Sequence, residues 1–148
     1  MIQAKKIFLC TTLLLTTMLP AFSETSLIKS DPYQLSTHIL DIGRGAGAKE
    51  VAVQLFKQAN NNNTVNWEFI SEDKTDANGR IKTFLPRQAN KQQQGIYKLV
   101  FITEPYFVKN KETSFYPQVE VVFNISDDTH YHVPITLSNF GYSTYRGN

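Results

Sequence analysis

Apolar residues alternate with polar residues along most of this 148-residue chain, in short runs that are separated by turn signals. In residues 50–57, EVAVQLFK, the side chains of Val51, Val53 and Leu55 fall on one face of an extended chain. This period of two is typical of half-buried β-strands. The same pattern, rich in β-branched and aromatic residues, predicts further strands at residues 66–72, 80–86, 95–103, 119–125, 130–137 and 141–146.

The segments between the predicted strands contain a turn and a short stretch without the alternation. DANG at residues 76–79 predicts a hairpin turn in which Gly79 takes a positive φ. Residues 105–112, PYFVKNKE, lack the alternation and predict a short helix, and the polar residues 24–35 are expected to be loose. Seven or so short strands favour an all-β sandwich, with a small barrel as the alternative. Exposed sheet edges favour cover by a partner subunit.

A basic start and an apolar run distinguish residues 1–23 from the rest. Two lysines precede the apolar stretch 7–19, which is too short to span a bilayer comfortably, and small residues follow at Ala21 and Ser23. This pattern indicates a secretory signal peptide, with a membrane anchor as the alternative. We therefore expect residues 24–148 to form the mature domain, exported to a Gram-negative periplasm.

Charge and cysteine content narrow the class of protein further. The whole chain has 15 basic and 13 acidic residues, but two of the lysines lie in residues 1–23, so the mature domain is balanced. This balance removes the support that the overall positive charge gave to general polyanion binding. The one cysteine, Cys10, lies inside the apolar run, which argues against a lipoprotein signal and leaves no disulfide in the domain.

Histidines are the main candidates for chemistry. His130 and His132 are two positions apart in a predicted strand, so they point to the same face and could form half of a metal site. Without further ligands in the pattern, ordinary surface or core histidines are the alternative. His38 follows Ser36 and Thr37, but neighbouring residues of a strand point to opposite faces, so the sequence is weak evidence for a serine or threonine nucleophile paired with His38.

Four motifs, in order, carry a family resemblance. The chain has LSTHILD at 35–41, TDANGR at 75–80, FYPQVEVVF at 115–123 and HYHVPITLSNFGYSTYRGN at 130–148. It closely resembles the transthyretin-like 5-hydroxyisourate hydrolases. The resemblance implies a transthyretin-like β-sandwich of seven to eight strands with one short helix, assembled as a homotetramer, a dimer of dimers with sites in the channel between dimers. It also implies hydrolysis of 5-hydroxyisourate, the product of urate oxidation, to 2-oxo-4-hydroxy-4-carboxy-5-ureidoimidazoline.

The resemblance also assigns residues. It implies that His38, Arg80 and His132 are catalytic, and that the chain end binds substrate through Tyr145, Arg146, Gly147 and Asn148. Neutral histidine can accept the proton of a water molecule near pH 7, and arginine can stabilise developing negative charge. This scheme requires no metal and no cofactor. Considered by themselves, both arginines would be ordinary surface residues.

Two positions depart from the family pattern. Residues 46–48 are Ala-Gly-Ala where the family has a proline, so a more flexible loop is expected. Asn148 stands where the family ends in serine. Two other functions stay open: a transthyretin-like carrier without a reaction, and a secreted β-sandwich that binds a ligand through its loops. The second predicts no convergence of His38, Arg80 and His132.

Overall fold

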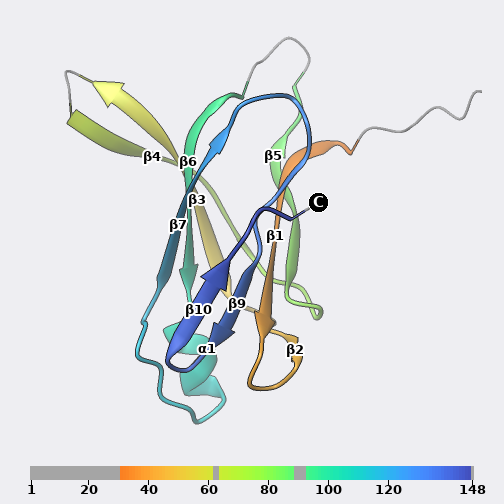
Figure 1. Cartoon of the computed structure of the whole chain (residues 1–148), viewed down its shortest axis with the longest axis vertical. Coiled ribbons are helices and arrows are strands. Elements are labelled where there is room, and N and C mark those ends of the chain that lie inside the picture. The colour runs from red at the N-terminus through yellow and green to blue at the C-terminus, as the bar shows by residue number, and fades with distance from the viewer. Residues whose placement is uncertain (1–30, 62–63, 89–92, 148) are drawn as a thin grey trace, which may run out of the picture.

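The computed structural model describes residues 31–61, 64–88 and 93–147, so the expected signal peptide at 1–23 lies outside the described residues. Two sheets pack face to face across an apolar core, which confirms the predicted sandwich (Figure 1). Eight of the described strands have four residues or more, and β2 and β8 have two each. The strands are β1 (Tyr33–Asp41), β2 (Ala46–Gly47), β3 (Ala52–Asn61), β4 (Thr64–Lys74), β5 (Arg80–Pro86), β6 (Gly95–Ile102), β7 (Val119–Ile125), β8 (Tyr131–His132), β9 (Ile135–Ser138) and β10 (Gly141–Thr144).

β1 is the centre of the six-stranded sheet. The sheet runs in the order β10-β9-β1-β2, and β5 and β8 also pair with β1. β8 and β9 run parallel to β1, whereas β5 runs antiparallel to it. Pro134, which has no N–H to donate to a ladder, lies in the break between β8 and β9. One central strand therefore brings together segments that are far apart in the sequence.

The second sheet is antiparallel throughout, in the order β4-β3-β6-β7. The inward residues of the two sheets meet in a core that is almost entirely apolar, as the alternation predicts. Burial of this apolar area is the main source of stability in a domain without disulfides. Its fully buried side chains include Leu35, Ile39, Val53, Leu55, Leu99, Phe101, Ile135 and Leu137.

The hairpin expected at residues 76–79 is wrong in its pairing. The turn is present, and Gly79 has a φ of 75° as predicted. However, β4 before the turn pairs with β3, and β5 after it pairs with β1 in the other sheet. The alternation of apolar and polar residues shows that a strand has a buried face, but it does not show which strand pairs with it. In sequence, a turn that connects two sheets therefore looks the same as a turn within a hairpin. This turn places Arg80 beside β1.

Part of the segment expected to be loose, residues 24–35, is strand, and residues 24–30 lie outside the described residues. Within the polar segment 24–35, residues 33–35 belong to β1, and Leu35 is completely buried opposite Phe84 and Tyr131. The inward alternation of Leu35, Thr37 and Ile39 continues through this segment, although a β-bulge or irregularity interrupts the β1–β5 register between Leu35 and Thr37.

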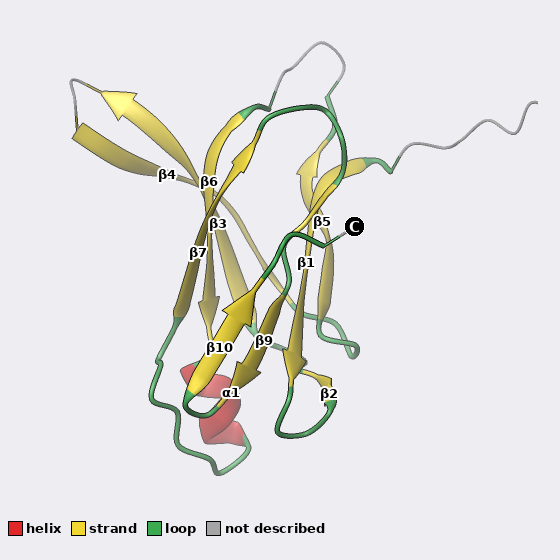
Figure 2. Ribbon diagram, in the orientation of Figure 1, coloured by secondary structure: helices red, strands yellow, loops and turns green. Residues whose placement is uncertain are grey.

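The short helix is confirmed. α1 (Glu104–Lys109) is the red helix of Figure 2. It has Pro105 in its first turn and buries Phe107. It lies at one end of the sandwich, near β2 in the view of Figure 1. Across the described ranges, no helix has the length and apolarity needed to cross a membrane.

Candidate active site

The outward face of β1 organises the candidate site. Leu35, Thr37 and Ile39 are completely buried, while Ser36 and His38 alternate with them and face away from the core. In the strand register, His38 lies opposite Arg80 of β5, and Ser36 lies opposite His132 of β8. The structure thus brings together the three residues predicted to be catalytic, from three strands of one sheet.

An open pocket of about 220 Å³ lies at this face. Its lining includes two cationic side chains, one imidazole, one serine hydroxyl and one carboxylate. His38 is not among the residues that line it, although it is the register partner of Arg80. The lining residues are Asp31, Ser36, Thr37, Arg80, Lys82 and His132.

The turn before β5 fixes the position of Arg80. Asp76 Oδ1 accepts hydrogen bonds from the backbone N–H groups of Asn78 and Arg80, at 2.8 and 2.9 Å. These bonds stabilise the carboxylate and lower the pKa of Asp76. A Cβ on Gly79 would lie 2.5 Å from the carbonyl oxygen of Ile39, so glycine allows the turn to pack against β1.

Residues 46–48, which lack the proline of the family pattern, also pack against the turn that precedes β5. Gly47 pairs with Leu40 of β1, and a Cβ on Gly47 would lie 2.1 Å from the carbonyl oxygen of Asn78. A proline ring does not fit in this space. Glycine where the family has proline therefore permits close approach of the turn that holds Arg80, and the loop is paired with β1 through β2.

Both site histidines are biased toward their neutral form. Partial burial lowers the pKa of His132, the positive charge of Arg80 lowers it further, and His38 adds to this only when it is itself protonated. Burial and Arg80 also lower the pKa of His38. These two imidazoles are therefore mainly unprotonated near pH 7, as proton acceptors must be. Arg80 forms no ion pair with any residue in the described ranges, so its guanidinium is available to a ligand.

The hydroxyl of Ser36 joins the two histidines of the HYH motif. Ser36 Oγ lies 2.8 Å from His130 Nε2 and 2.9 Å from His132 Nδ1. The prediction that His130 and His132 share a face is consistent with these contacts. One nitrogen of each ring is engaged by serine, and within the described ranges no group of three metal-ligating residues is found. Thr37 is completely buried and donates to the Val133 carbonyl at 2.7 Å, which removes it as a nucleophile.

Gly147 packs directly on the imidazole of His132. Its N–H donates to the His132 carbonyl at 2.9 Å, and the two residues form an isolated antiparallel bridge. A Cβ on Gly147 would lie 2.5 Å from His132 Cδ2. Gly147 therefore lies against the ring, and this contact leaves no room for a side chain at position 147.

The other predicted residues of the chain end lie elsewhere. Tyr145 and Arg146 line a separate pocket beside β7, and the Arg146 guanidinium carbon lies 5.0 Å from the centre of the Tyr131 ring. Their role in substrate binding stays a prediction. Asn148 lies outside the described residues.

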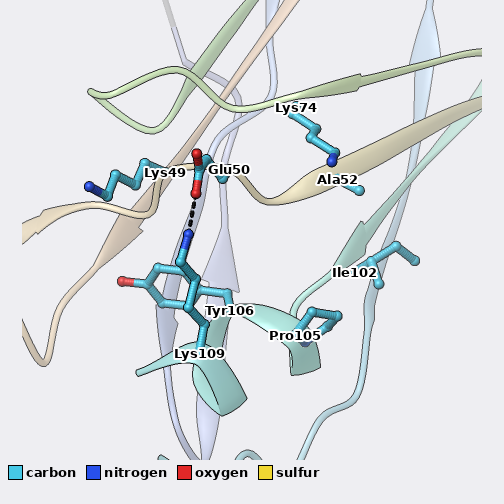
Figure 3. Close-up of a pocket in the computed structure, with 8 residues that line it drawn as sticks. All are labelled: Lys49, Glu50, Ala52, Lys74, Ile102, Pro105, Tyr106 and Lys109. Atoms are coloured by element: carbon cyan, nitrogen blue, oxygen red, sulfur yellow. Dashed lines mark hydrogen bonds and ion pairs between the residues drawn. The ribbon is translucent and has the colours of Figure 1, made fainter. Parts of the chain in front are cut away.

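A larger pocket, of about 450 Å³, lies between α1 and the beginning of β3 (Figure 3). Lys49, Lys74 and Lys109 line it, but Lys109 is paired with Glu50, and the other two ammonium groups point in different directions. It contains no histidine and no arginine. Its volume exceeds that of the pocket at β1, but only the pocket at β1 groups an imidazole with an unpaired guanidinium.

Three members of the site were missed by the sequence analysis. Ser36 was considered only as a partner of His38, whereas it bonds to His130 and His132. Lys82 and Asp31, which line the pocket, were not considered at all. A signal did exist for Lys82, because it is two residues from Arg80 in a predicted strand and shares its face.

Known proteins resemble this chain over most of its length. The family model described as HIUase/Transthyretin matches residues 35–147. A probable 5-hydroxyisourate hydrolase of Caenorhabditis elegans is 46% identical over 121 residues, covering 77% of this chain and 81% of the relative. The solved structure of Klebsiella pneumoniae 5-hydroxyisourate hydrolase is 35% identical, with a TM-score of 0.63 and coverage of 77% and 98%.

A transthyretin is also similar in structure. Sea bream transthyretin, solved in complex with thyroxine, is 28% identical with a TM-score of 0.68, and the match covers 77% of this chain and 94% of that protein. The family match spans all three residues that the outward face of β1 brings together. The chain therefore belongs to the HIUase/Transthyretin family.

Proposed function

We propose that this protein hydrolyses 5-hydroxyisourate to 2-oxo-4-hydroxy-4-carboxy-5-ureidoimidazoline in the degradation of urate. The observation that carries this proposal is the register of three strands, which places His38, Arg80 and His132 on one outward face. Relatives that bear the name 5-hydroxyisourate hydrolase, from a nematode to bacteria and the mouse, support it.

His132 is the proposed general base. Its pKa is lowered, so the neutral imidazole is available to take a proton from water as the water attacks a ring carbonyl carbon. The ring C–N bond then breaks, and the proton passes to the leaving nitrogen. His38, whose pKa is also lowered, is the second neutral imidazole and orients the water or the substrate.

Arg80 is the proposed electrophilic group. Its planar fork of N–H donors suits the carbonyl oxygens of a flat ring, and its charge stabilises the oxyanion of the tetrahedral intermediate. Lys82 in the same pocket adds a second positive charge. Since Arg80 has no ion-pair partner in the described part of the chain, binding substrate breaks no existing pair.

The test is direct. Purified protein is added to freshly made 5-hydroxyisourate, and the ultraviolet decay is followed against the uncatalysed background. The proposal expects decay that accelerates in proportion to protein concentration, with the ureidoimidazoline as the first product. Decay at the background rate would reject it.

A carrier function is the second candidate, because the fold is also that of sea bream transthyretin with thyroxine bound. A carrier has no use for two neutral histidines beside a free arginine. Calorimetric titration with thyroxine measures this function independently of the reaction. Tight thyroxine binding by a protein that does not accelerate decay would favour the carrier.

Assembly and location are part of the proposal. We infer a homotetramer, a dimer of dimers, because the site faces outward on a sheet and the edge strand β10 is exposed at Tyr142. Light scattering at micromolar concentration should give about four times the monomer mass. Export to the periplasm is inferred from residues 1–23, and sequencing of the native protein should begin near Glu24. A fully active monomer would reject the first inference, and a cytosolic protein that retains Met1 the second.

A further inference from the structure

A chain of three hydrogen bonds leads from the backbone of β1 to the proposed base. His130 Nδ1 lies 3.0 Å from the carbonyl oxygen of Tyr33. His130 Nε2 lies 2.8 Å from Ser36 Oγ, and Ser36 Oγ lies 2.9 Å from His132 Nδ1. Every link has the length of a normal hydrogen bond, and the chain ends on the residue that takes the proton in the proposed reaction.

The first link sets the direction of the others. A carbonyl oxygen only accepts, so His130 Nδ1 must carry the proton. In neutral His130 the other nitrogen, Nε2, is then an acceptor, and the Ser36 hydroxyl donates to it. Having used its only proton, the Ser36 oxygen accepts from His132, so His132 Nδ1 carries a proton. The carboxylate of Asp31, at 3.6 Å from His130 Nδ1, is too distant to replace the Tyr33 carbonyl.

We propose that Ser36 and His130 are positioning residues that hold His132 in the Nδ1–H tautomer, which leaves the lone pair on Nε2 as the proton acceptor. This inference rests on the proposed function of the site. Within the described residues, His132 Nε2 has no hydrogen-bond partner. A neutral imidazole in the opposite tautomer would present an N–H from Nε2 and could not accept a proton there.

The chain is anchored by the fold at each step. Ser36 is only 8% exposed, and its carbonyl accepts from the N–H of Val133 at 3.0 Å, beside the β1–β8 pairing of Ser36 with His132. The serine is therefore held by its backbone as well as its side chain. Gly147 packs against the His132 ring. The ring has little freedom to rotate away from the serine.

Nitrogen NMR of the histidine side chains tests the tautomer without substrate. The chain has three histidines, so ¹⁵N-labelled imidazoles give three spin systems, and single substitutions assign them. At a pH where His132 is neutral, we expect a protonated Nδ1 and an unprotonated Nε2. In the Ser36→Ala variant this pattern should be lost, whereas Ser36→Thr keeps the hydroxyl and should preserve it.

Kinetics provide the second readout. A positioned general base typically accelerates a reaction 10²–10⁴-fold. If the tautomer of His132 is no longer fixed, part of this acceleration is lost. Ser36→Ala should therefore lower kcat by roughly tenfold or more, with little change in KM. Ser36→Thr should retain most of the rate. Two amide substitutions at position 130 form a matched pair of variants. His130→Asn keeps a donor for the Tyr33 carbonyl but is too short to reach Ser36. His130→Gln can place an acceptor near the position of Nε2. The glutamine variant should be the more active.

The outcomes separate this inference from the proposed function. A wild-type His132 protonated at Nε2, or a Ser36→Ala variant with the normal tautomer and rate, overturns the inference and leaves the hydrolase intact. A locked tautomer in a protein that does not hydrolyse 5-hydroxyisourate supports the assignment of the chain and rejects the function. A covalent adduct on Ser36 during turnover would make the serine a nucleophile and also overturn the positioning role.

Discussion

Replacement of Gly147 by alanine tests whether the chain end fixes the proposed base. The substitution adds one methyl group, and its Cβ would lie 2.5 Å from His132 Cδ2, 3.2 Å from Cγ and 3.3 Å from Cβ. Carbon atoms that are not bonded rest at about 3.5–4.0 Å, so the nearest contact is about 1 Å too short. Either the imidazole or the last residues must move by about that amount.

The structure gives the expected magnitude. A displacement of about 1 Å in a catalytic group costs on the order of 10²-fold. We therefore expect Gly147→Ala to lower kcat/KM by roughly 10²-fold, or about 2.7 kcal/mol of transition-state stabilisation. The effect on folding should be small, because Gly147 does not belong to the apolar core and can shift without opening it.

Stopped-flow measurement of 5-hydroxyisourate decay provides the assay, with thermal unfolding in parallel. Gly141→Ala is the matched control, since it adds the same methyl group at the start of β10, where the nearest atom is Ser138 Oγ at 3.7 Å. The control should retain nearly full activity. If both variants are equally active, the contact between Gly147 and His132 has no catalytic importance and the reasoning is refuted.

Three further predictions concern charge and the chain end. Burial and Arg80 lower the pKa of His132, and its neutral form is the active one. The acid limb of kcat/KM against pH should therefore have an apparent pKa below the ordinary histidine value of 6.5. An apparent pKa at or above 6.5 would contradict this. Arg80→Lys and Arg80→Gln should both lose most activity, because each lacks the planar fork of donors. Only the glutamine variant removes the positive charge, so only it should move the acid limb of kcat/KM to higher pH. Identical pH profiles for the two variants would show that Arg80 does not act on the pKa of His132. Asn148→Ser should raise kcat/KM by no more than about tenfold, near 1.4 kcal/mol, and a thousandfold rescue of an inactive parent would show that the serine is essential.

The sequence was informative wherever one strand had one buried face. The alternation at Val51, Val53 and Leu55 predicted β3, and the same reasoning located most other strands, because side-chain period follows directly from backbone geometry. Pairing between strands was not predictable in this way. The turn at residues 76–79 was interpreted as a hairpin, although it connects the two sheets. Partner choice depends on packing across the whole sandwich, which no local window contains.

The candidate site, like the fold, was predictable from the sequence only in part. Its three main residues were identified by resemblance, and the strand register then explained why they meet. Ser36 was missed as the link between the histidines because it is more than ninety residues from them in the chain, and only the parallel pairing of β1 with β8 joins them. Gly147 was identified from its motif, but its reason for being glycine lies in a contact with the His132 ring.

The most direct test of the account is kcat/KM for His132→Asn on 5-hydroxyisourate, measured beside the parent protein at equal concentration and with matched thermal stability. Asparagine keeps a polar side chain in the pocket but cannot act as the general base. The account predicts a fall of roughly 10²-fold or more, since a positioned base contributes at least that much. A folded His132→Asn variant that turns over at nearly the parental rate would contradict the assignment of this site.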